Sequence, residues 1–308
     1  MSPETVASAL HKDPRIAGLL LGAFVGDALA LGPHWVYDPS TIQAKLGTVS
    51  GFNDPLTPYH PGKKAGDYTH IGDQMWLLQQ SISDSRWQFE VTHYFKRWKA
   101  FWDDEKTISY RDKATKETLH NITKGLPMME AGALSDELAG PARGMPVLAA
   151  GLIHGQSVEA MIESIQEQTA LTHRSADALH AAAFLARLIQ GLVTGLDLPK
   201  AIAKALGASA QVVKDLGVKA TSPNLASVDT TTAISTLGQS CDMEEALPAC
   251  LLLLSRHGHD YKEAMVQNVM AGGDSATRGI VVGGVLGYYH GQSAVPEAWR
   301  KALTTPPF

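Results

Sequence analysis

The sequence predicts an all-α fold, and three observations support this prediction. Apolar residues recur three or four positions apart along most of the 308-residue chain, which is the period of a helix with one buried face. Alternating runs bounded by turn residues, which would predict strands, are scarce. Capping residues begin several of the periodic segments, and glycines end them. No repeat or low-complexity tract marks a boundary, so we expect a single domain over residues 1–308.

The segments predicted to be helical are, in chain order, residues 16–31, 73–82, 136–148, 158–167, 176–193, 199–213, 244–254, 260–270 and 275–289. Ser157 and Asp260 are typical N-cap residues for two of these segments, and Asp229 is one for a further helix. Residues 87–102 interleave aromatic and basic side chains at helical spacing. That spacing favours core packing, with charged ends reaching solvent, over an exposed stacking surface.

Two of the helical segments carry glycines four residues apart. They are Gly22 and Gly26 in the first, and Gly279, Gly283, Gly287 and Gly291 in the last. Each glycine inside a helix costs about 0.5–1 kcal/mol relative to alanine, so a whole stripe needs compensation. Because residues four apart share one face, we expect two buried helices whose backbones approach closely. The close approach serves either core packing alone or the support of a polar site at the helix ends.

Composition excludes several classes of protein. A net charge of −5, with no Lys/Arg run longer than a pair, argues against a nucleic-acid binder. Cys241 and Cys250 are too few for a disulfide framework or a thiolate zinc site. Residues 16–33 are apolar, but they contain Asp27, which argues against a signal peptide or a membrane span. We therefore expect a soluble, cytoplasmic protein without a nucleic-acid or membrane partner, and its oligomeric state stays open.

Three clusters of polar and aromatic side chains stand at the edges of the predicted helices. They are Asp27 with His34, Trp35 and Tyr37; Thr69 with His70, Asp73 and Gln74; and Asp274 with Ser275, Thr277 and Arg278. A helix cap would explain one acid or hydroxyl in each cluster, but not the rest. The second cluster follows a long loop rich in Pro and Gly, a type of segment that is often functional. The third follows a double glycine at a helix start, where backbone N–H groups favour an anion such as a phosphate.

Together these clusters resemble the ADP-ribosylglycohydrolase family, from residue 16 to about residue 303. The matching motifs are GLLLGAFVGDAL (18–29), GPARGMP (140–146), LTH (171–173) and the most specific one, AGGD through GYY (271–289). The resemblance implies a single-domain orthogonal helical bundle that hydrolyses ADP-ribosyl substrates.

The same resemblance implies two Mg²⁺ ions, held by a Thr-Asp-Asp-Thr run before an early helix and an Asp-x-Asp-Thr run before a late one. It also implies a Glu seven residues after the first-helix Asp. This chain keeps only one carboxylate, Asp73, in the early run, and it keeps Asp274 and Thr277 in the late one. Ala276 stands at the second acid of the late run and His34 at the expected Glu, so two of the four metal carboxylates and the acid/base carboxylate are missing. We therefore expect at most one Mg²⁺, on Asp73, Asp274 and Thr277.

The sequence leaves two functions open. The motifs GPHWVYD (32–38) and THIGDQ (69–74) resemble the branch that includes the jellyfish J-type crystallins, so one alternative is a non-catalytic, crystallin-like structural or ligand-binding protein. The other is a divergent hydrolase that cleaves an N-glycosidic bond of a ribosyl or ADP-ribosyl substrate. In that hydrolase Asp73 or Asp274 would stabilise the positive sugar, and His34 or His70 would activate water. The substrate-binding candidates are Asp27, Trp35, Tyr37, Thr69, Gln74, His173, Ser275, Thr277 and Arg278.

Overall fold

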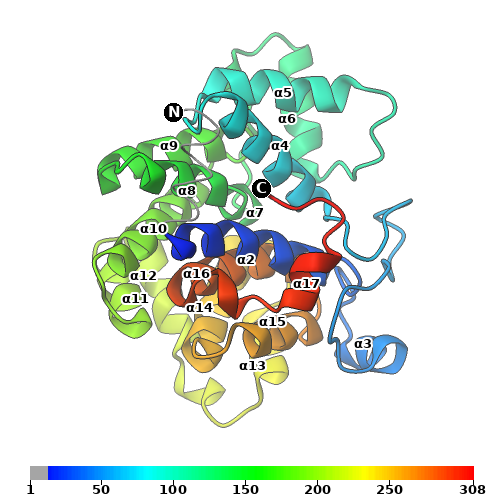
Figure 1. The fold of residues 1–308 in the computed structure, drawn as a ribbon, viewed down its shortest axis with the longest axis vertical. Coiled ribbons are helices and arrows are strands. Elements are labelled where there is room, and N and C mark those ends of the chain that lie inside the picture. The colour runs from blue at the N-terminus through cyan, green and yellow to red at the C-terminus, as the bar shows by residue number, and fades with distance from the viewer. Residues whose placement is uncertain (1–12) are drawn as a thin grey trace.

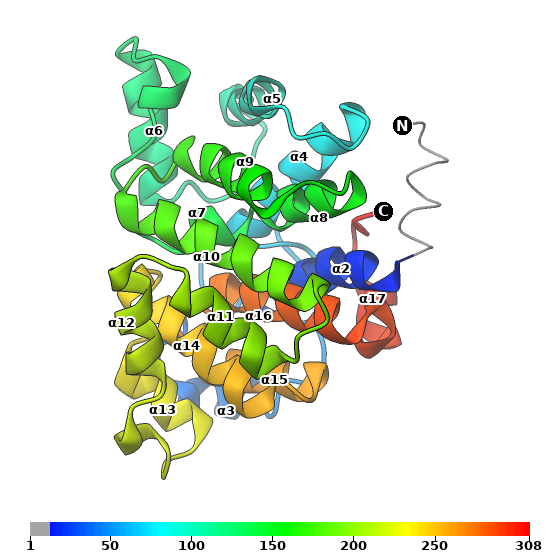
Figure 2. The same ribbon diagram turned by 90° about the vertical axis from the view of Figure 1, so that its left-hand side faces the viewer.

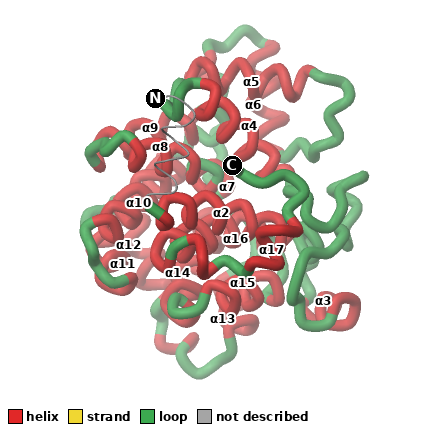
Figure 3. The backbone as a smooth tube through the Cα atoms, in the orientation of Figure 1, coloured by secondary structure: helices red, strands yellow, loops and turns green. Residues whose placement is uncertain are grey.

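The computed structural model describes residues 13–308, and within this range the chain forms helices and loops without a β-strand (Figure 3). The all-α prediction is therefore confirmed. The buried apolar side chains form one continuous cluster.

The α-helices are, in chain order, α2 (Pro14–Ala30), α3 (Pro39–Leu46), α4 (His70–Asp84), α5 (Val91–Asp103), α6 (Lys113–Thr123), α7 (Ala139–Ala142), α8 (Met145–Ile153), α9 (Val158–Ala170), α10 (Ala176–Val193), α11 (Leu198–Gly207), α12 (Gln211–Ala220), α13 (Thr230–Leu237), α14 (Met243–His257), α15 (Tyr261–Met270), α16 (Ser275–His290) and α17 (Glu297–Ala302). Short 3₁₀ helices are η1 (Met128–Glu130), η2 (Pro223–Leu225) and η3 (Gln292–Ala294).

Helices α2 and α16 run side by side through the centre of the molecule (Figure 1). Helices α4, α5, α6, α8 and α9 lie on one side of this pair, and α11–α15 lie on the other. The long helix α10 packs between α9 and α11 (Figure 2). By length and apolar composition alone α10 could cross a membrane, but 61% of it is buried against its neighbours, as in a core helix.

The glycines of α2 and α16 face one another, as the spacing predicted. A Cβ atom at Gly22 would lie 2.1 Å from the carbonyl oxygen of Gly283, and one at Gly26 would lie 2.1 Å from that of Gly279. The two backbones therefore touch, and only glycine fits at these levels. The pairing also aligns the C-terminal end of α2 with the N-terminal end of α16, where two of the predicted polar clusters lie.

The predicted segments 136–148 and 199–213 each contain two helices instead of one. Pro146 lies in the first turn of α8, where its missing N–H costs nothing, so the helix restarts there. In the second segment the Ser209 hydroxyl donates to the carbonyl oxygen of Ala205 and helps to end α11. The prediction for residues 87–102 is confirmed, because Tyr94, Trp98 and Trp102 of α5 are buried.

Candidate functional site

Asp27 is buried in the last turn of α2 and contacts the start of α4. Its carboxylate accepts hydrogen bonds from Thr69 N at 2.8 Å and Thr69 Oγ1 at 2.6 Å. Thr69 is the N-cap of α4, and a Cβ atom at Gly72 would lie 2.1 Å from Asp27 Oδ2. Burial raises the pKa of Asp27 to about 7. Asp27 and Thr69 therefore join α2 to α4, and neither lines the cavity described below.

The double glycine before α16 has a structural role of its own. Gly272 and Gly273 have φ angles of +72° and +68°, which glycine adopts without strain. Their loop pairs with the loop after α2, since Trp35 N donates to Gly273 O at 2.9 Å and Gly273 N donates to Val36 O at 2.8 Å. Trp35 itself has a φ of +61°, an uncommon value for a bulky residue. The pairing holds the Trp35 ring beside the start of α16.

Side chains of the protein already use the N–H groups at the start of α16. Asp274 is the N-cap: it accepts from Thr277 N at 3.3 Å and from Thr277 Oγ1 at 2.7 Å. Ala276 N donates to Nδ1 of His34 at 3.4 Å, and that nitrogen lies 3.6 Å from Asp274 Oδ1. Burial raises the pKa of Asp274 to about 6 and, with the neighbouring His60 and His70 rings, lowers that of His34. The expected phosphate at this helix start therefore has no free donors at these positions.

Two further histidines lie beside carboxylates in the same region. His70 Nε2 is 3.6 Å from Asp112 Oδ2, and His173 Nε2 is 3.5 Å from Glu137 Oε2. Burial lowers the pKa of His70, and Asp112 offsets only part of this. Burial acts to raise the pKa of Glu137, but His173 outweighs it and holds that pKa below its ordinary value. Each of these pairs thus joins a buried imidazole to a carboxylate.

These pairs surround one cavity of about 170 Å³. Its lining residues are Trp35, His70, Ile71, Tyr110, Asp112, Lys113, Glu137, Ala139, Cys241 and Asp274. Three of them are carboxylates, Asp112, Glu137 and Asp274, and each has a histidine behind or beside it. Burial raises the pKa of Cys241, so its sulfur stays a thiol at neutral pH. The cavity is the candidate functional site.

Asp73 does not share this cavity. Its carboxylate accepts two hydrogen bonds from Lys63 Nζ, at 2.6 and 2.8 Å, and it lines a separate hollow with Phe101 and Lys106. Asp73 and Asp274 therefore line different hollows, and a loop lysine pairs with the first acid.

Of the expected Mg²⁺ ligands, Asp274 lines the cavity, whereas Asp73 is paired with Lys63 in another hollow. Mg²⁺ requires near-octahedral oxygen ligands, and its protein sites use carboxylates. Asp274 and Thr277 are hydrogen-bonded to each other, and the groups nearest to them include the His34 imidazole. Mg²⁺ does not fit this set of donors.

Two predicted substrate-binding residues have structural roles instead. Arg278 is buried, and its guanidinium donates to Asn268 Oδ1 at 3.0 Å and to the carbonyl oxygen of Gly272. It therefore supports the double-glycine loop and is not positioned to hold an anion in the cavity. Gln74 Oε1 accepts from Trp98 Nε1 at 2.8 Å and from Arg143 Nη1 at 2.7 Å. This amide ties α4 to α5 and to the end of α7.

Among the other candidates, the structure brings Trp35, His70 and Asp274 to the cavity wall and His34 and His173 directly behind it. Tyr37 is 53% exposed and does not line the cavity. Ser275 is buried, and its hydroxyl has no hydrogen-bond partner within residues 13–308.

Five residues that line the cavity were not predicted from the sequence as site residues: Tyr110, Asp112, Lys113, Glu137 and Cys241. Asp112 could have been predicted from the sequence as a helix N-cap, because it precedes α6 and accepts a hydrogen bond from Thr115 N. Glu137 and Cys241 lie in two loops that are joined by a hydrogen bond from Leu138 N to Cys241 O, 2.9 Å long. No local sequence pattern predicts this contact.

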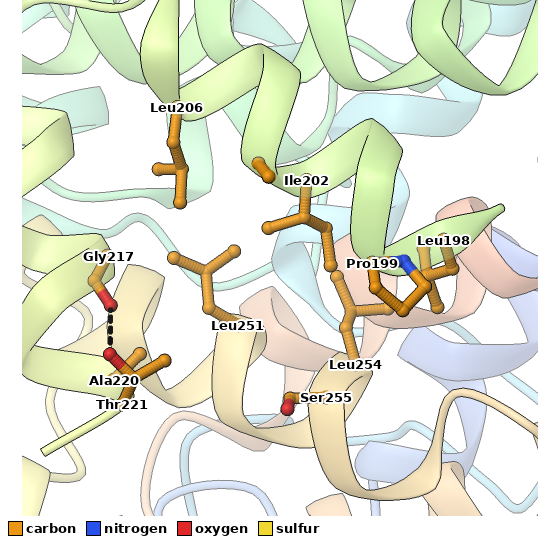
Figure 4. Close-up of a pocket in the computed structure, with 11 residues that line it drawn as sticks. Leu198, Pro199, Ile202, Leu206, Gly217, Ala220, Thr221, Leu251, Leu254 and Ser255 are labelled. Carbon is orange, nitrogen blue, oxygen red and sulfur yellow. Dashed lines mark hydrogen bonds between the residues drawn. The ribbon is translucent and has the colours of Figure 1, made fainter. Parts of the chain in front are cut away.

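A larger apolar hollow of about 270 Å³ lies between α11, α12 and α14 (Figure 4). Aliphatic side chains such as Leu206, Leu251 and Leu254 line it, and its polar groups are the hydroxyls of Thr221 and Ser255. It has no carboxylate, imidazole, amine or thiol among its lining residues, so the carboxylate cavity is the stronger candidate for chemistry.

Comparisons with known proteins agree with the fold. The model of the ADP-ribosylglycohydrolase family matches residues 8–306. An uncharacterized protein of Archaeoglobus fulgidus is 24% identical over 292 residues, which cover 94% of this chain and 92% of that protein. A solved structure described as an ADP-ribosylglycohydrolase-related protein complex superposes with a TM-score of 0.65 at 21% identity, covering 94% of this chain and 92% of the other. The chain belongs to the ADP-ribosylglycohydrolase family.

Proposed function

We propose that the protein is a divergent hydrolase that cleaves the N-glycosidic bond of a ribosyl or ADP-ribosyl substrate without a two-magnesium centre. One observation carries the proposal: Asp112, Glu137 and Asp274 line one cavity, and a buried histidine stands beside each. The family supplies the reaction class, and the cavity supplies groups that can perform it. We also propose a cytoplasmic location and a small-molecule partner, on the ground of composition.

The chemistry requires carboxylates in two roles. Departure of the leaving group develops positive charge at the anomeric carbon, which a nearby carboxylate stabilises, while a base activates water. We assign the first role to Asp274, which the Thr277 hydroxyl holds in place at 2.7 Å. Glu137, held by His173, takes the second role. The indole of Trp35, on the cavity wall, offers an apolar face for the sugar.

The cavity volume suggests which part of the substrate is enclosed. Pockets that enclose drug-sized ligands occupy roughly 300–1,000 Å³. This cavity has about 170 Å³, which suits a single sugar ring. A nucleotide attached to that sugar would extend outside, towards the exposed Tyr37 or Lys113.

The proposal is tested with the full chain and a panel of N-ribosyl and N-ADP-ribosyl compounds, assayed for free sugar by chromatography with and without EDTA. We expect turnover that Glu137→Gln and Asp274→Asn each reduce by at least about 100-fold, the usual contribution of a general acid or base. Glu163→Gln changes an exposed carboxylate on α9 and is the matched control. Turnover that survives both cavity variants would overturn the assignment.

The second candidate is the non-catalytic, crystallin-like protein. It is favoured by the internal hydrogen bonds of Asp274 and by the poor fit to Mg²⁺. Turnover separates the hydrolase from this alternative, and a thermal shift with ADP-ribose separates a ligand-binding protein from a purely structural one. A shift that Asp274→Ala abolishes, without turnover, supports the ligand-binding protein, whereas the absence of both shift and turnover supports the structural protein.

A further inference from the structure

Three buried histidines meet beside the cavity. His34 follows α2, His60 belongs to the long loop before α4, and His70 is the first residue of α4. They are 0%, 3% and 2% exposed, and their ring centroids lie 5.5–6.0 Å apart. One ring nitrogen of each lies within 4.8 Å of the nitrogens of the other two. His60 was not among the residues that the sequence singled out.

The spacing of the ring nitrogens matches that of metal ligands. His60 Nε2 and His70 Nδ1 are 3.3 Å apart. In a tetrahedral zinc site with Zn–N bonds of 2.0–2.1 Å, two ligand nitrogens lie about 3.3–3.4 Å apart. His34 needs only a small movement to complete the set, because its ligand nitrogen is already within 4.8 Å of the others.

The cluster also has polar atoms that lack partners. His34 Nε2 and His60 Nδ1 are buried and make no hydrogen bond within the part of the chain that the structure describes. A buried polar atom without a partner costs about 1–3 kcal/mol, and two such atoms on adjacent rings need an explanation. A bound cation would give His34 Nε2 a partner, whereas His60 would bind through Nε2, so the ion does not account for His60 Nδ1.

Carboxylates stand behind two of the three imidazoles. His70 Nε2 lies 3.6 Å from Asp112 Oδ2, and His34 Nδ1 lies 3.6 Å from Asp274 Oδ1. Metal binding through His34 Nε2 requires Nδ1 to carry the proton and to face Asp274, in place of accepting the Ala276 N–H. Metal-binding histidines usually direct their second nitrogen at a carboxylate or carbonyl in this way, which fixes the ring and partly offsets the cation's charge. Lys63 is paired with Asp73, which offsets its charge, although that charge still acts on His60.

An aromatic shell encloses the cluster. Trp35 stacks on His34 with a centroid distance of 4.4 Å, and it contacts Tyr59 and Tyr110 edge-on at 5.0 and 5.2 Å. Such a shell limits water access and keeps the local dielectric low, which strengthens coordination.

We propose that His34, His60 and His70 form a binding site for a divalent cation of the Zn²⁺ type, in place of the Mg²⁺ expected from the family resemblance. Imidazole nitrogens suit zinc and related transition metals, whereas Mg²⁺ prefers oxygen. Three protein ligands leave the fourth position of a tetrahedral ion free. The site shares His70 with the cavity wall, and Asp112 and Asp274 stand behind its rings, so the proposal deepens the proposed function; metal binding is measured without substrate, so the two can fail separately.

The test uses the full chain, stripped with a chelator and titrated with Co²⁺ in the absence of any substrate. Tetrahedral Co²⁺ with nitrogen ligands gives intense visible bands, whereas octahedral Co²⁺ gives weak ones. We expect one equivalent of intense bands, which Zn²⁺ displaces and excess Mg²⁺ does not. Weak octahedral bands, no binding, or displacement by Mg²⁺ would each overturn the proposal, and none of these results depends on glycosidase activity.

Variants identify the ligands. His60→Gln should weaken Co²⁺ binding by more than about 100-fold, and Asp112→Asn should weaken it about 10- to 100-fold, as loss of a supporting carboxylate does. His93→Gln changes an exposed histidine of α5 and should leave binding intact. A folded His60→Gln protein that binds Co²⁺ like the parent would disprove the assignment. If His60→Gln does not fold, the spectrum of the parent protein still decides the outcome.

Discussion

Substitution of Gly22 by alanine tests whether contact between α2 and α16 holds the fold together. The new Cβ atom would lie 2.1 Å from Gly283 O, about 1 Å inside the closest ordinary contact, so the helices must separate. They cannot separate locally, because Gly18 and Gly287 touch one turn away, with a Cβ at Gly18 falling 2.0 Å from Gly287 O. The separation would also disturb the hydrogen bond from Tyr261 Oη to Gly22 O, 2.8 Å long.

The expected size follows from these terms. Overpacking of a core costs about 1–3 kcal/mol and sometimes more, and loss of a hydrogen bond adds about 1 kcal/mol. The higher helix propensity of alanine relative to glycine offsets about 0.5–1 kcal/mol of this loss. We therefore expect Gly22→Ala to lower the free energy of unfolding by at least about 2 kcal/mol and the Tm by about 4 °C or more.

Thermal unfolding by circular dichroism and urea titration measure the effect. Gly207→Ala is the matched control, because Gly207 is the last residue of α11 and a Cβ there meets nothing within 4 Å. We expect that variant to be neutral or stabilised by up to about 1 kcal/mol. Equal stability of Gly22→Ala and the parent would refute the argument that backbone contact at this level requires glycine.

Three further predictions concern stability. Asp27 binds its proton more tightly in the folded state, at a pKa of about 7, than in the unfolded chain, so its contribution to stability falls as pH rises from about 4 to about 7. As pH rises over that range, the parent should therefore lose up to about 4 kcal/mol of unfolding free energy relative to Asp27→Asn. Urea titrations at several pH values measure this, and a difference that does not change with pH would contradict it. Gly272→Ala places a Cβ 2.5 Å from Val36 O at a positive φ. It should lower the Tm more than the control Gly195→Ala, where φ is also positive but a Cβ meets nothing within 4 Å. Equal Tm values for the two variants would contradict this prediction. A double-mutant cycle of Lys63→Gln and Asp73→Asn should give a coupling of about 1 kcal/mol, as for a partly buried ion pair, and no coupling would show that the pair is incidental.

Much of the fold could be predicted from the sequence, because its signals are local. Helical periodicity and capping residues located most of the long helices, and Ser157, Asp229 and Asp260 are N-caps as expected. The glycine stripes predicted a specific tertiary contact, since four-residue spacing leaves one bare face on each helix. The breaks at Gly144 and Ala208 were missed because apolar periodicity continues across them.

The site was harder to predict, because its groups are selected by long-range contacts. Glu137 reaches the cavity only because its loop pairs with Cys241, about a hundred residues later. Asp73 has the residue type and helix position of a metal ligand, yet Lys63 folds back from the preceding loop and engages it. Residue type alone cannot distinguish an acid that faces a cavity from one that faces a lysine.

The buried histidines near the starts of α4 and α16 affect the electrostatics of this site in a consistent direction. Asp274 at the start of α16 and Asp27 beside the start of α4 are costly to ionise, as their raised pKa values show. A further carboxylate in the position of His34 would bury a second negative charge beside Asp274, which is energetically costly. A bound hard dication would be needed to offset that cost. A neutral imidazole there accepts the Ala276 N–H and carries no charge into the core. At this site three buried histidines thus each lie beside a single carboxylate. That arrangement suits acid–base chemistry or a softer metal better than paired Mg²⁺.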